Sequence, residues 1–213
     1  MIIAVDGPAA SGKGTLSRRL AKHLGYAHLD TGKIYRAVGQ SVLLSGGDPS
    51  DPENALKAAR ELTPEALSDP NLTADTVATA ASKVAVIDAV RAELLTFQQN
   101  FAKTPPDGRP GAILDGRDIG TVVCPEANVK LFVDAGVEVR AERRYKELLD
   151  RGEKIIYARV LQELKDRDDR DRNRAVAPLI AASDAFVLDT SVLGPEEAFR
   201  AALAIIESEQ SDA

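Results

Sequence analysis

Aromatic side chains are scarce in this sequence, and tryptophan is absent. The interior must therefore be filled mainly by alanine, leucine, valine and isoleucine, in a chain of 213 residues that is long enough for a sizeable core. The single cysteine, Cys124, excludes an internal disulfide, and we interpret it as a small buried side chain that follows a strand. The two histidines, His23 and His28, have no partner at the spacing of a metal site, so the sequence assigns neither a role.

Long hydrophobic runs and an excess of positive charge are also missing. No apolar run approaches the roughly 20 residues that a membrane-spanning helix needs, and the N-terminal segment lacks the basic and apolar regions of a signal peptide. The net charge of −6 argues against a surface for a nucleic acid polymer, because such surfaces are usually basic. We therefore expect a cytoplasmic protein that binds neither a membrane nor a nucleic acid polymer. No exposed apolar stripe stands out, so we expect a monomer.

The most informative segment is rich in glycine and lies between an apolar run and a helical pattern. Its residues are Gly7, Pro8, Ala9, Ala10, Ser11, Gly12, Lys13, Gly14 and Thr15. Strand, glycine-rich loop and helix form the context of a phosphate-binding P-loop, where backbone N–H groups and the helix N-terminus surround phosphate oxygens. Lys13 adds a mobile positive charge. The segment predicts a binding site for a nucleoside triphosphate.

The P-loop departs from the common pattern at one position. Gly14 stands where a serine or threonine usually follows the lysine, and the hydroxyl comes one residue later, at Thr15. We therefore assign no direct protein ligand to Mg²⁺. We expect Thr15 to hold the ion mainly through water.

Five short apolar runs are typical of buried parallel strands, and each ends in an aspartate. They cover residues 2–6, 26–30, 111–115, 129–134 and 186–189. Helical patterns separate them, at about 14–24, 32–45, 53–62, 75–103, 137–151, 155–172 and 195–208. Residues 63–73 are predicted to form a short connection. The alternation predicts an α/β three-layer sandwich, in which helices cover both faces of a five-stranded parallel sheet.

Polar residues follow the second and third predicted strands, at the functional edge of such a sheet. Arg36 can clamp a second phosphate group near Thr31. The alternative is a helix capped by Asp30 or Thr31 with a solvated arginine. Asp115 ends the third strand, where an acid can order Mg²⁺ through water. Arg117 and Asp118 lie between two glycines and offer a phosphate clamp and a hydrogen-bond acceptor; the alternative is that they pair with each other.

Arginine and aspartate alternate densely over residues 167–174. On a continuous helix, one face would carry Arg167, Arg170, Asp171 and Arg174. Cations gathered there would stabilise the charge that develops on a phosphoryl group in transfer. The alternative is a self-paired helix on the surface.

A smaller basic cluster follows the fourth predicted strand and consists of Arg140, Arg143 and Arg144. From a helix in a mobile lid, these side chains could reach a bound nucleotide. A solvated helix face is an equally good interpretation of the pattern.

Four segments together resemble a known enzyme family in their order and spacing: GPAASGKGT, LDTGKIYR, LDGRDIGTVV and RDDRDRNRAVAPL. They resemble the nucleoside monophosphate kinases, and most specifically the bacterial cytidylate kinases, over residues 2 to about 206. The resemblance implies in-line phosphoryl transfer from ATP, with Mg²⁺, to CMP and dCMP, which gives CDP and dCDP in pyrimidine nucleotide metabolism. CMP, dCMP and ATP are the partners it implies.

The resemblance also implies a single domain, 1–213, with three parts. The core would comprise 1–45, 104–140 and 175–208, the monophosphate-binding region about 46–103, and the lid about 141–174. The longer bacterial form has an insert with its own small sheet. Leu62–Val77 is too short and too rich in proline for that sheet, so the insert is interpreted as trimmed.

Roles follow from the resemblance position by position. The residues implied to bind CMP are Thr31, Arg36, Ser82, Arg91, Arg117, Asp118, Arg167, Asp171 and Arg174. The residues implied to be catalytic are Lys13, Arg117, Arg167 and Arg174. Thr31, Arg36 and Arg117 would hold the acceptor phosphate, Ser82 and Arg91 would contact the cytosine ring, and Arg167 and Asp171 the ribose. Arg174 would contact the phosphates. Asp118 would accept a hydrogen bond from the exocyclic amine, which uracil lacks.

Two alternative functions are considered. One is a P-loop kinase that acts on AMP, UMP or a non-nucleotide acid. The other is a nucleotide switch of the GTPase class, which is disfavoured because the sequence contains neither DxxG nor NKxD.

Overall fold

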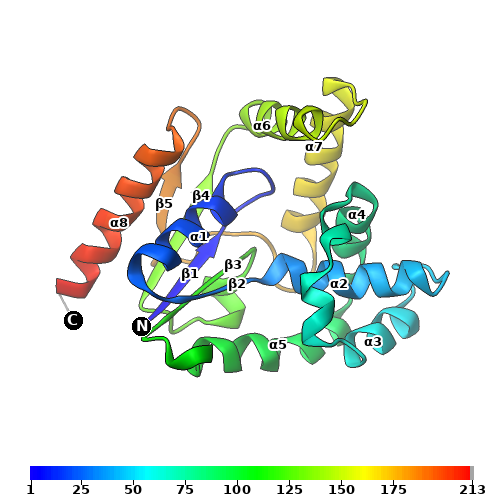
Figure 1. Cartoon of the computed structure of the whole chain (residues 1–213), viewed down its shortest axis with the longest axis horizontal. Helices are drawn as coiled ribbons and strands as arrows, with labels where there is room; N and C mark the ends of the chain where they lie inside the picture. Colours follow the sequence, from blue (N-terminus) through cyan, green and yellow to red (C-terminus); the bar gives the residue numbers. More distant parts are fainter. Residues whose placement is uncertain (212–213) are drawn as a thin grey trace.

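The computed structural model describes residues 1–211. Its centre is a five-stranded parallel sheet with the strand order β2-β3-β1-β4-β5 (Figure 1). The strands are β1 Ile2–Asp6, β2 Ala27–Asp30, β3 Ala112–Gly116, β4 Val129–Asp134 and β5 Phe186–Asp189. All five predicted strands are confirmed to within one residue, and their terminal aspartates lie at one edge of the sheet.

Helices connect the strands and cover both faces of the sheet, as the alternation predicted. They are α1 Lys13–Leu24, α2 Thr31–Leu44, α3 Pro52–Arg60, α4 Asp75–Val84, α5 Asp88–Lys103, α6 Val137–Asp150, α7 Tyr157–Asn173 and α8 Pro195–Ser211. None of the helices in residues 1–211 is both long and apolar enough to cross a membrane.

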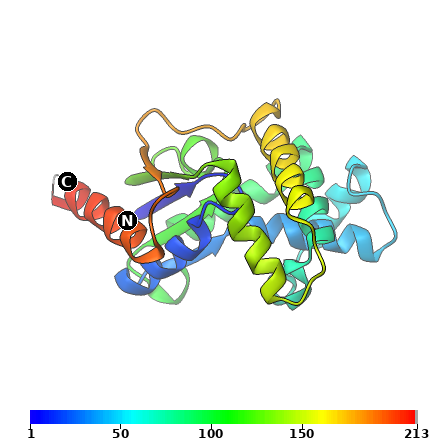
Figure 2. The same ribbon diagram turned by 90° about the horizontal axis from the view of Figure 1, so that it is seen from above.

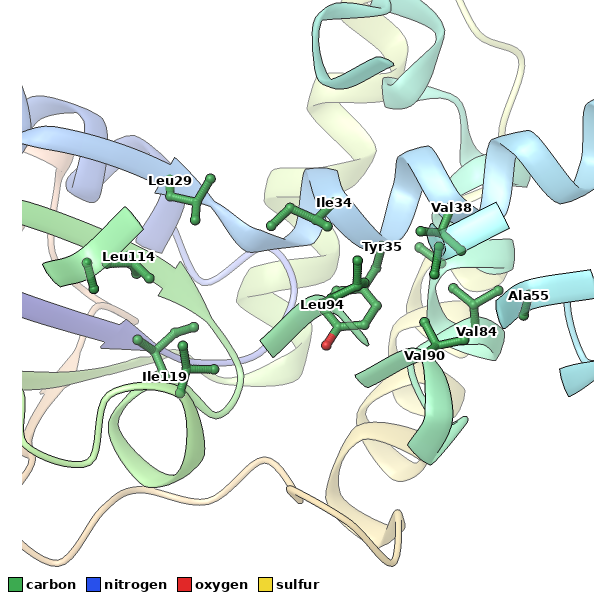
Figure 3. Close-up of a cluster of buried hydrophobic side chains, with 14 of the residues drawn as sticks. Leu29, Ile34, Tyr35, Val38, Ala55, Val84, Val90, Leu94, Leu114 and Ile119 are labelled. Atoms are coloured by element: carbon green, nitrogen blue, oxygen red, sulfur yellow. The ribbon is translucent and has the colours of Figure 1, made fainter. Parts of the chain in front are cut away.

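Alternate residues of each central strand belong to different cores, since successive side chains of a strand point to opposite faces. Ile3 and Val5 pack with residues of α1 and α8. Ala4 and Leu114 pack with α2, α3, α5 and the turn after β3 (Figure 3). Each fully buried leucine or isoleucine contributes about 1.5–3 kcal/mol, so these two cores hold the three layers together. The predicted three-layer sandwich is thereby confirmed.

The helix predicted over 75–103 is wrong in one respect, because it is two helices. The helix is interrupted at residues 85–87, where Ile87 has an extended backbone. The break lets Val84 and Val90 both enter the core on the α2 side of the sheet. Arg91 Nη1 donates to the Ala85 carbonyl over 3.3 Å, which compensates for the interrupted helix. No glycine or proline marks the position, so the local pattern did not reveal it.

The connection over 63–73 contains two short 3₁₀ helices, η1 Pro64–Ser68 and η2 Pro70–Thr73, and no strand. This agrees with a trimmed insert. Cys124 is buried, as predicted, but follows a single π-helical turn, η4 Ile119–Val123, and not a strand. Burial raises the pKa of its thiol to about 11, which suits a packing role.

The α6–α7 hairpin forms a separate layer above the P-loop end of the sheet (Figure 1; Figure 2). Its own small core joins the two helices to the P-loop through Ala9, which packs with Ala141, Leu148, Val160 and Leu164. Helix α7 contacts α6 on one side and α4 on the other. The hairpin therefore stands where the predicted lid would lie, and the domain boundaries given above stay predictions.

Candidate functional site

The loop between β1 and α1 has the backbone of a phosphate cradle. Gly7 has φ +150°, and a Cβ there would lie 2.0 Å from the Val133 carbonyl oxygen, so only glycine fits. Gly12 adopts a left-handed conformation at the N-cap of α1, and having no side chain it leaves the first helical N–H groups open to an anion. The Ser11 hydroxyl is buried without a hydrogen-bond partner in residues 1–211. These features suit a bound triphosphate.

Lys13 is the cation of this loop and is held in a cluster of like charges. Its Nζ lies 3.4 Å from the Pro8 carbonyl oxygen. Burial and, to a lesser extent, the positive charges of Arg117 and Arg167 lower the pKa of Lys13 to about 7, against the opposing effect of nearby aspartates. Burial likewise lowers the pKa of Arg167 to about 10. These cations are only partly neutralised, since Arg117 and Arg167 share the carboxylate of Asp171, and together they form an electrostatic site for a polyanion.

This cluster predicts that ATP binding takes up a proton. At pH 8 Lys13, with its pKa near 7, is mostly neutral in the free protein, whereas the triphosphate restores the charged form. About 0.9 proton should enter per ATP bound, following from the one-unit difference between pH and pKa. Calorimetry at pH 8 in two buffers of different ionisation enthalpy measures this number. The Lys13→Met variant should lose the uptake; an equal uptake in both proteins would contradict the assignment.

The carboxylate and hydroxyl proposed for Mg²⁺ lie next to the P-loop. Asp115 Oδ1 is 3.8 Å from the position that a Cβ on Gly14 would take, and Thr15 Oγ1 accepts from Arg18 Nη2 over 3.3 Å. No cluster of three or more His, Cys, Asp or Glu side chains that could hold a metal occurs within the described residues. Mg²⁺ bound with a nucleotide needs few protein ligands, since phosphates and water complete its shell. The oxygen donors of Asp115 and Thr15 therefore fit a Mg²⁺ carried by a nucleotide.

Apart from the phosphate cradle, a small cavity of about 50 Å³ lies between α2, α4, α5 and the loop after β3. It brings together all but one of the residues predicted to bind CMP: Thr31, Ser82, Arg91, Arg117, Asp118, Arg167, Asp171 and Arg174. Tyr35, which the sequence did not single out, also lines it. The remaining predicted residue, Arg36, lies in an adjoining cleft of about 440 Å³ together with Ala9, Ala10 and Arg167. The cleft thus connects the P-loop to the small cavity.

The acids of this cavity are each held by arginines from other elements. Asp118 pairs with Arg91 from α5, and both side chains are buried. Arg117 Nε donates to Asp171 Oδ2 over 2.9 Å. Burial raises the pKa of Asp171, but Arg117 and its neighbours outweigh burial and hold the pKa below its usual value. The alternative in which Arg117 pairs with Asp118 is therefore wrong.

The predicted helical face over 167–174 is wrong at its last residue. Helix α7 ends at Asn173, and Arg174 has an extended backbone, which turns it toward Asp118 at a distance of 3.7 Å. Arg167 and Asp171 stay on the helix and face the cavity. The Arg167 Nε and one Arg174 Nη are buried without hydrogen-bond partners in the described chain. Buried donors that are left unpaired in this way cost free energy, which a polar ligand would recover.

Asp6, at the end of β1, holds the loop after β3 in place, a contact that the sequence analysis did not predict. Its carboxylate accepts from the N–H groups of Ile119 and Gly120, each over 2.8 Å. Burial raises the pKa of Asp6 to about 6 despite these bonds. The contact ties the strand that enters the P-loop to the loop that carries Asp118. Its position at a strand end was the only available signal.

The basic cluster after β4 is not solvated. Arg140 is buried and bonds Asp168 on α7 through both Nη atoms, at 3.1 and 2.5 Å. It also donates to the Ala9 carbonyl over 3.2 Å, so it joins the hairpin to the P-loop. Arg143 donates to Thr190. The solvated interpretation is therefore wrong for Arg140, and a role of the cluster in reaching a bound nucleotide stays a prediction.

Arg144 connects the hairpin to the region after the short connection. It pairs with Asp75, the first residue of α4, and with Glu147 on its own helix. Arg151 donates to the Thr73 carbonyl over 3.3 Å. These polar contacts join the α6–α7 hairpin to the start of α4 on this side of the cleft.

A P-loop and an arginine-lined second cavity, joined by one cleft at the carboxyl edge of a parallel sheet, define a P-loop phosphotransferase that acts on a second anionic substrate. Sequence comparison narrows the class. The family model described as cytidylate kinase matches residues 3–208, and the chain belongs to this family.

Curated relatives agree over nearly the full length. The cytidylate kinase of Paramagnetospirillum magneticum is 61% identical, covering 98% of this chain and 99% of the relative. That of Rhodospirillum rubrum is 59% identical, covering 97% of each.

Solved structures support the fold alone. An uncharacterized protein from Eubacterium ventriosum is similar with a TM-score of 0.55 at 12% identity, covering 99% of each chain. TT1252 from Thermus thermophilus has a TM-score of 0.50 at 18% identity, covering 98% of this chain and 97% of that one.

Proposed function

We propose that the protein transfers the γ-phosphoryl group of ATP to CMP or dCMP, giving ADP and CDP or dCDP. The observation that carries this proposal is the small cavity in which Arg91 and Arg174 flank Asp118, the residue that directly follows Arg117. The cavity lies at the end of a cleft that starts at the P-loop. A buried carboxylate is a hydrogen-bond acceptor and suits an exocyclic amine. The membership of the cytidylate kinase family agrees with it.

ATP would lie along the start of α1. A largely apolar pocket of about 360 Å³ borders the P-loop there and is lined by Leu16, Val133, Leu193 and Arg143 among others. A purine ring fits such a surface, with its phosphates at the N-terminus of α1. Mg²⁺, when bound with ATP, would neutralise phosphate charge, and Thr15 and Asp115 would hold its water shell.

The acceptor nucleotide would occupy the small cavity and the adjoining cleft. Thr31, Arg36 and Arg117 are proposed to hold its phosphate, and Ser82 and Arg91 its base. Arg167 and Asp171 are proposed to contact the ribose, and Arg174 the phosphates. Each of these roles stays a proposal.

The chemistry needs no general base, because the attacking oxygen belongs to a phosphate that is already ionised. The new bond joins that oxygen to the γ-phosphorus while the bond to the bridging β–γ oxygen breaks and ADP leaves. Lys13 lies close enough to Arg117 and Arg167 for their charges to interact, and the three cations would stabilise the charge on the moving group. Positioning and electrostatics supply most of the reduction in the barrier.

The test is an ADP-release assay with ATP and Mg²⁺ against CMP, dCMP, UMP, AMP and GMP, with a reaction without acceptor as background. We expect CMP and dCMP to be used with a kcat/KM at least about 100-fold above UMP, because a site built to bond the amine rejects uracil, which lacks it. AMP and GMP should also be used poorly, because their two-ring bases are larger than a pyrimidine and the cavity is small, at about 50 Å³. Faster turnover on UMP, AMP or GMP would contradict the assignment of cytidine specificity. The monomeric state and cytoplasmic location stay predictions from the sequence.

A further inference from the structure

His28 lies beside the acid next to the P-loop. Its Nε2 is 2.6 Å from Asp115 Oδ2, across the boundary between β2 and β3. The register pairs His28 with Ile113 and Asp30 with Asp115, so both side chains point to the face that α1 covers, where Ile113 packs. The carboxylate can only accept, so the imidazole nitrogen donates.

The hydrogen bond leaves Asp115 with one oxygen committed and one directed at the P-loop. Asp115 Oδ1 lies 3.8 Å from the position that a Cβ on Gly14 would take, where Arg18 Nη1 lies at 3.7 Å. The backbone of the same residue is held too, because Thr31 Oγ1 donates to the Asp115 carbonyl over 2.8 Å. The Asp115 side chain is only 5% exposed. With its backbone and Oδ2 both held, this carboxylate keeps a single orientation.

The surroundings of His28 point toward a charged ligand rather than toward an apolar core. A pocket of about 230 Å³ opens beside it and is lined by Arg18, Asp30 and Lys33 as well as by Leu29 and Leu67. Arg18 in turn donates to Thr15 Oγ1, the second candidate for the Mg²⁺ shell. The pair His28–Asp115 and the pair Arg18–Thr15 thus lie side by side at the start of α1, where Arg18 and Asp115 both approach Gly14.

We infer that His28 is a positioning residue for the metal-bound nucleotide: it holds Asp115 so that Oδ1 faces the water shell of the Mg²⁺ that ATP carries. Hydrogen-bond partners behind a carboxylate orient it toward the ion, and their loss typically lowers metal affinity by about 10- to 100-fold. The inference rests on the proposed function in that ATP must bind the P-loop, but it does not depend on which acceptor is used.

Three variants separate this role from a merely structural one. His28→Leu removes the donor, and His28→Gln keeps an amide N–H that can reach Asp115. His23→Gln is the matched control, since His23 lies exposed on α1. Calorimetry measures the affinity for ATP under two conditions: in the presence of a chelator, which removes metal, and in saturating Mg²⁺. The ratio of the second affinity to the first is the gain due to Mg²⁺.

We expect the gain to be about tenfold smaller in His28→Leu than in the parent protein, while the metal-free affinity stays within about twofold of the parent value. His28→Gln should retain most of the gain. The half-saturating Mg²⁺ concentration in turnover should rise in parallel. An unchanged gain in His28→Leu, or an equal loss of affinity with and without Mg²⁺, would overturn the inference. These binding measurements use no acceptor, so the failure of the acceptor panel and the failure of this inference are distinguishable.

Discussion

Asp118→Asn should remove most of the discrimination between CMP and UMP, with the ratio of their kcat/KM values falling by about 100-fold or more. In the free protein the Asp118 carboxylate is shared between Arg91 and Arg174. The amide oxygen of asparagine will face these arginines, which turns its NH₂ group toward the base. Cytosine then presents an amine to an amine, whereas uracil presents a carbonyl oxygen that can accept. Parallel assays with CMP and UMP measure the ratio.

The substitution also weakens a buried ion pair, so it needs a control of the same kind. Asp168→Asn weakens the buried pair with Arg140 at a site that does not line the acceptor cavity. Disrupting a buried pair can cost several kcal/mol, and both variants should therefore show a lower Tm. Only Asp118→Asn should change the ratio of CMP to UMP. A similar change in both variants would mean that stability, and not contact with the base, sets the specificity.

Lys13→Met should lower kcat by about 10³-fold or more while the KM for CMP changes little. Methionine keeps the length of the side chain and removes its charge. Charge on the moving phosphoryl group develops in a cleft where Lys13 meets Arg117 and Arg167, and a single cation so placed is worth about 10³- to 10⁵-fold in related transfers. Steady-state kinetics with both substrates varied measures the separate effects.

Lys22→Met is the matched control for Lys13→Met, because Lys22 lies exposed on the same helix, and its kcat should stay within about twofold. The stability of the free protein provides a second check. The pKa of Lys13 lies below that of a free lysine, so its charged form is unfavourable in the folded state at pH 6, and Lys13→Met should raise the Tm there. A kcat within tenfold of the parent protein would contradict the catalytic role.

Local patterns predicted the frame of the site because each depends on a few neighbouring residues. The P-loop needs glycine where Gly7 meets the Val133 carbonyl and where Gly12 turns left-handed, so it can be recognised in one segment. Short apolar runs that end in aspartate are strands whose ends share an edge in any parallel sheet. These two rules were enough to bring Lys13, Asp115 and Arg117 to the same region.

Local patterns did not predict which charged residues pair with one another or where some helices end. From the sequence, Arg140 could equally well be solvated. The structure shows that it is buried in a pair with Asp168, which lies 28 residues later in the chain. The chain is interrupted between α4 and α5 without a glycine or proline, because Val84 and Val90 both pack in the core. Arg174 does not lie on the helical face, because α7 ends one residue before it. Each depends on residues that are distant in the sequence.

The sequence by itself determined the strands, the phosphate-binding loop, the types of charged residue and, through the resemblance, the family, since backbone preference and side-chain chemistry are local properties. Only the tertiary structure decided that Asp118 pairs with Arg91 and not with Arg117, that Asp6 holds the loop after β3, and that His28 is bonded to Asp115. These pairings follow from the register of β2 on β3 and from burial, which makes an unpaired charge costly and so selects a partner from whichever element the packing brings near.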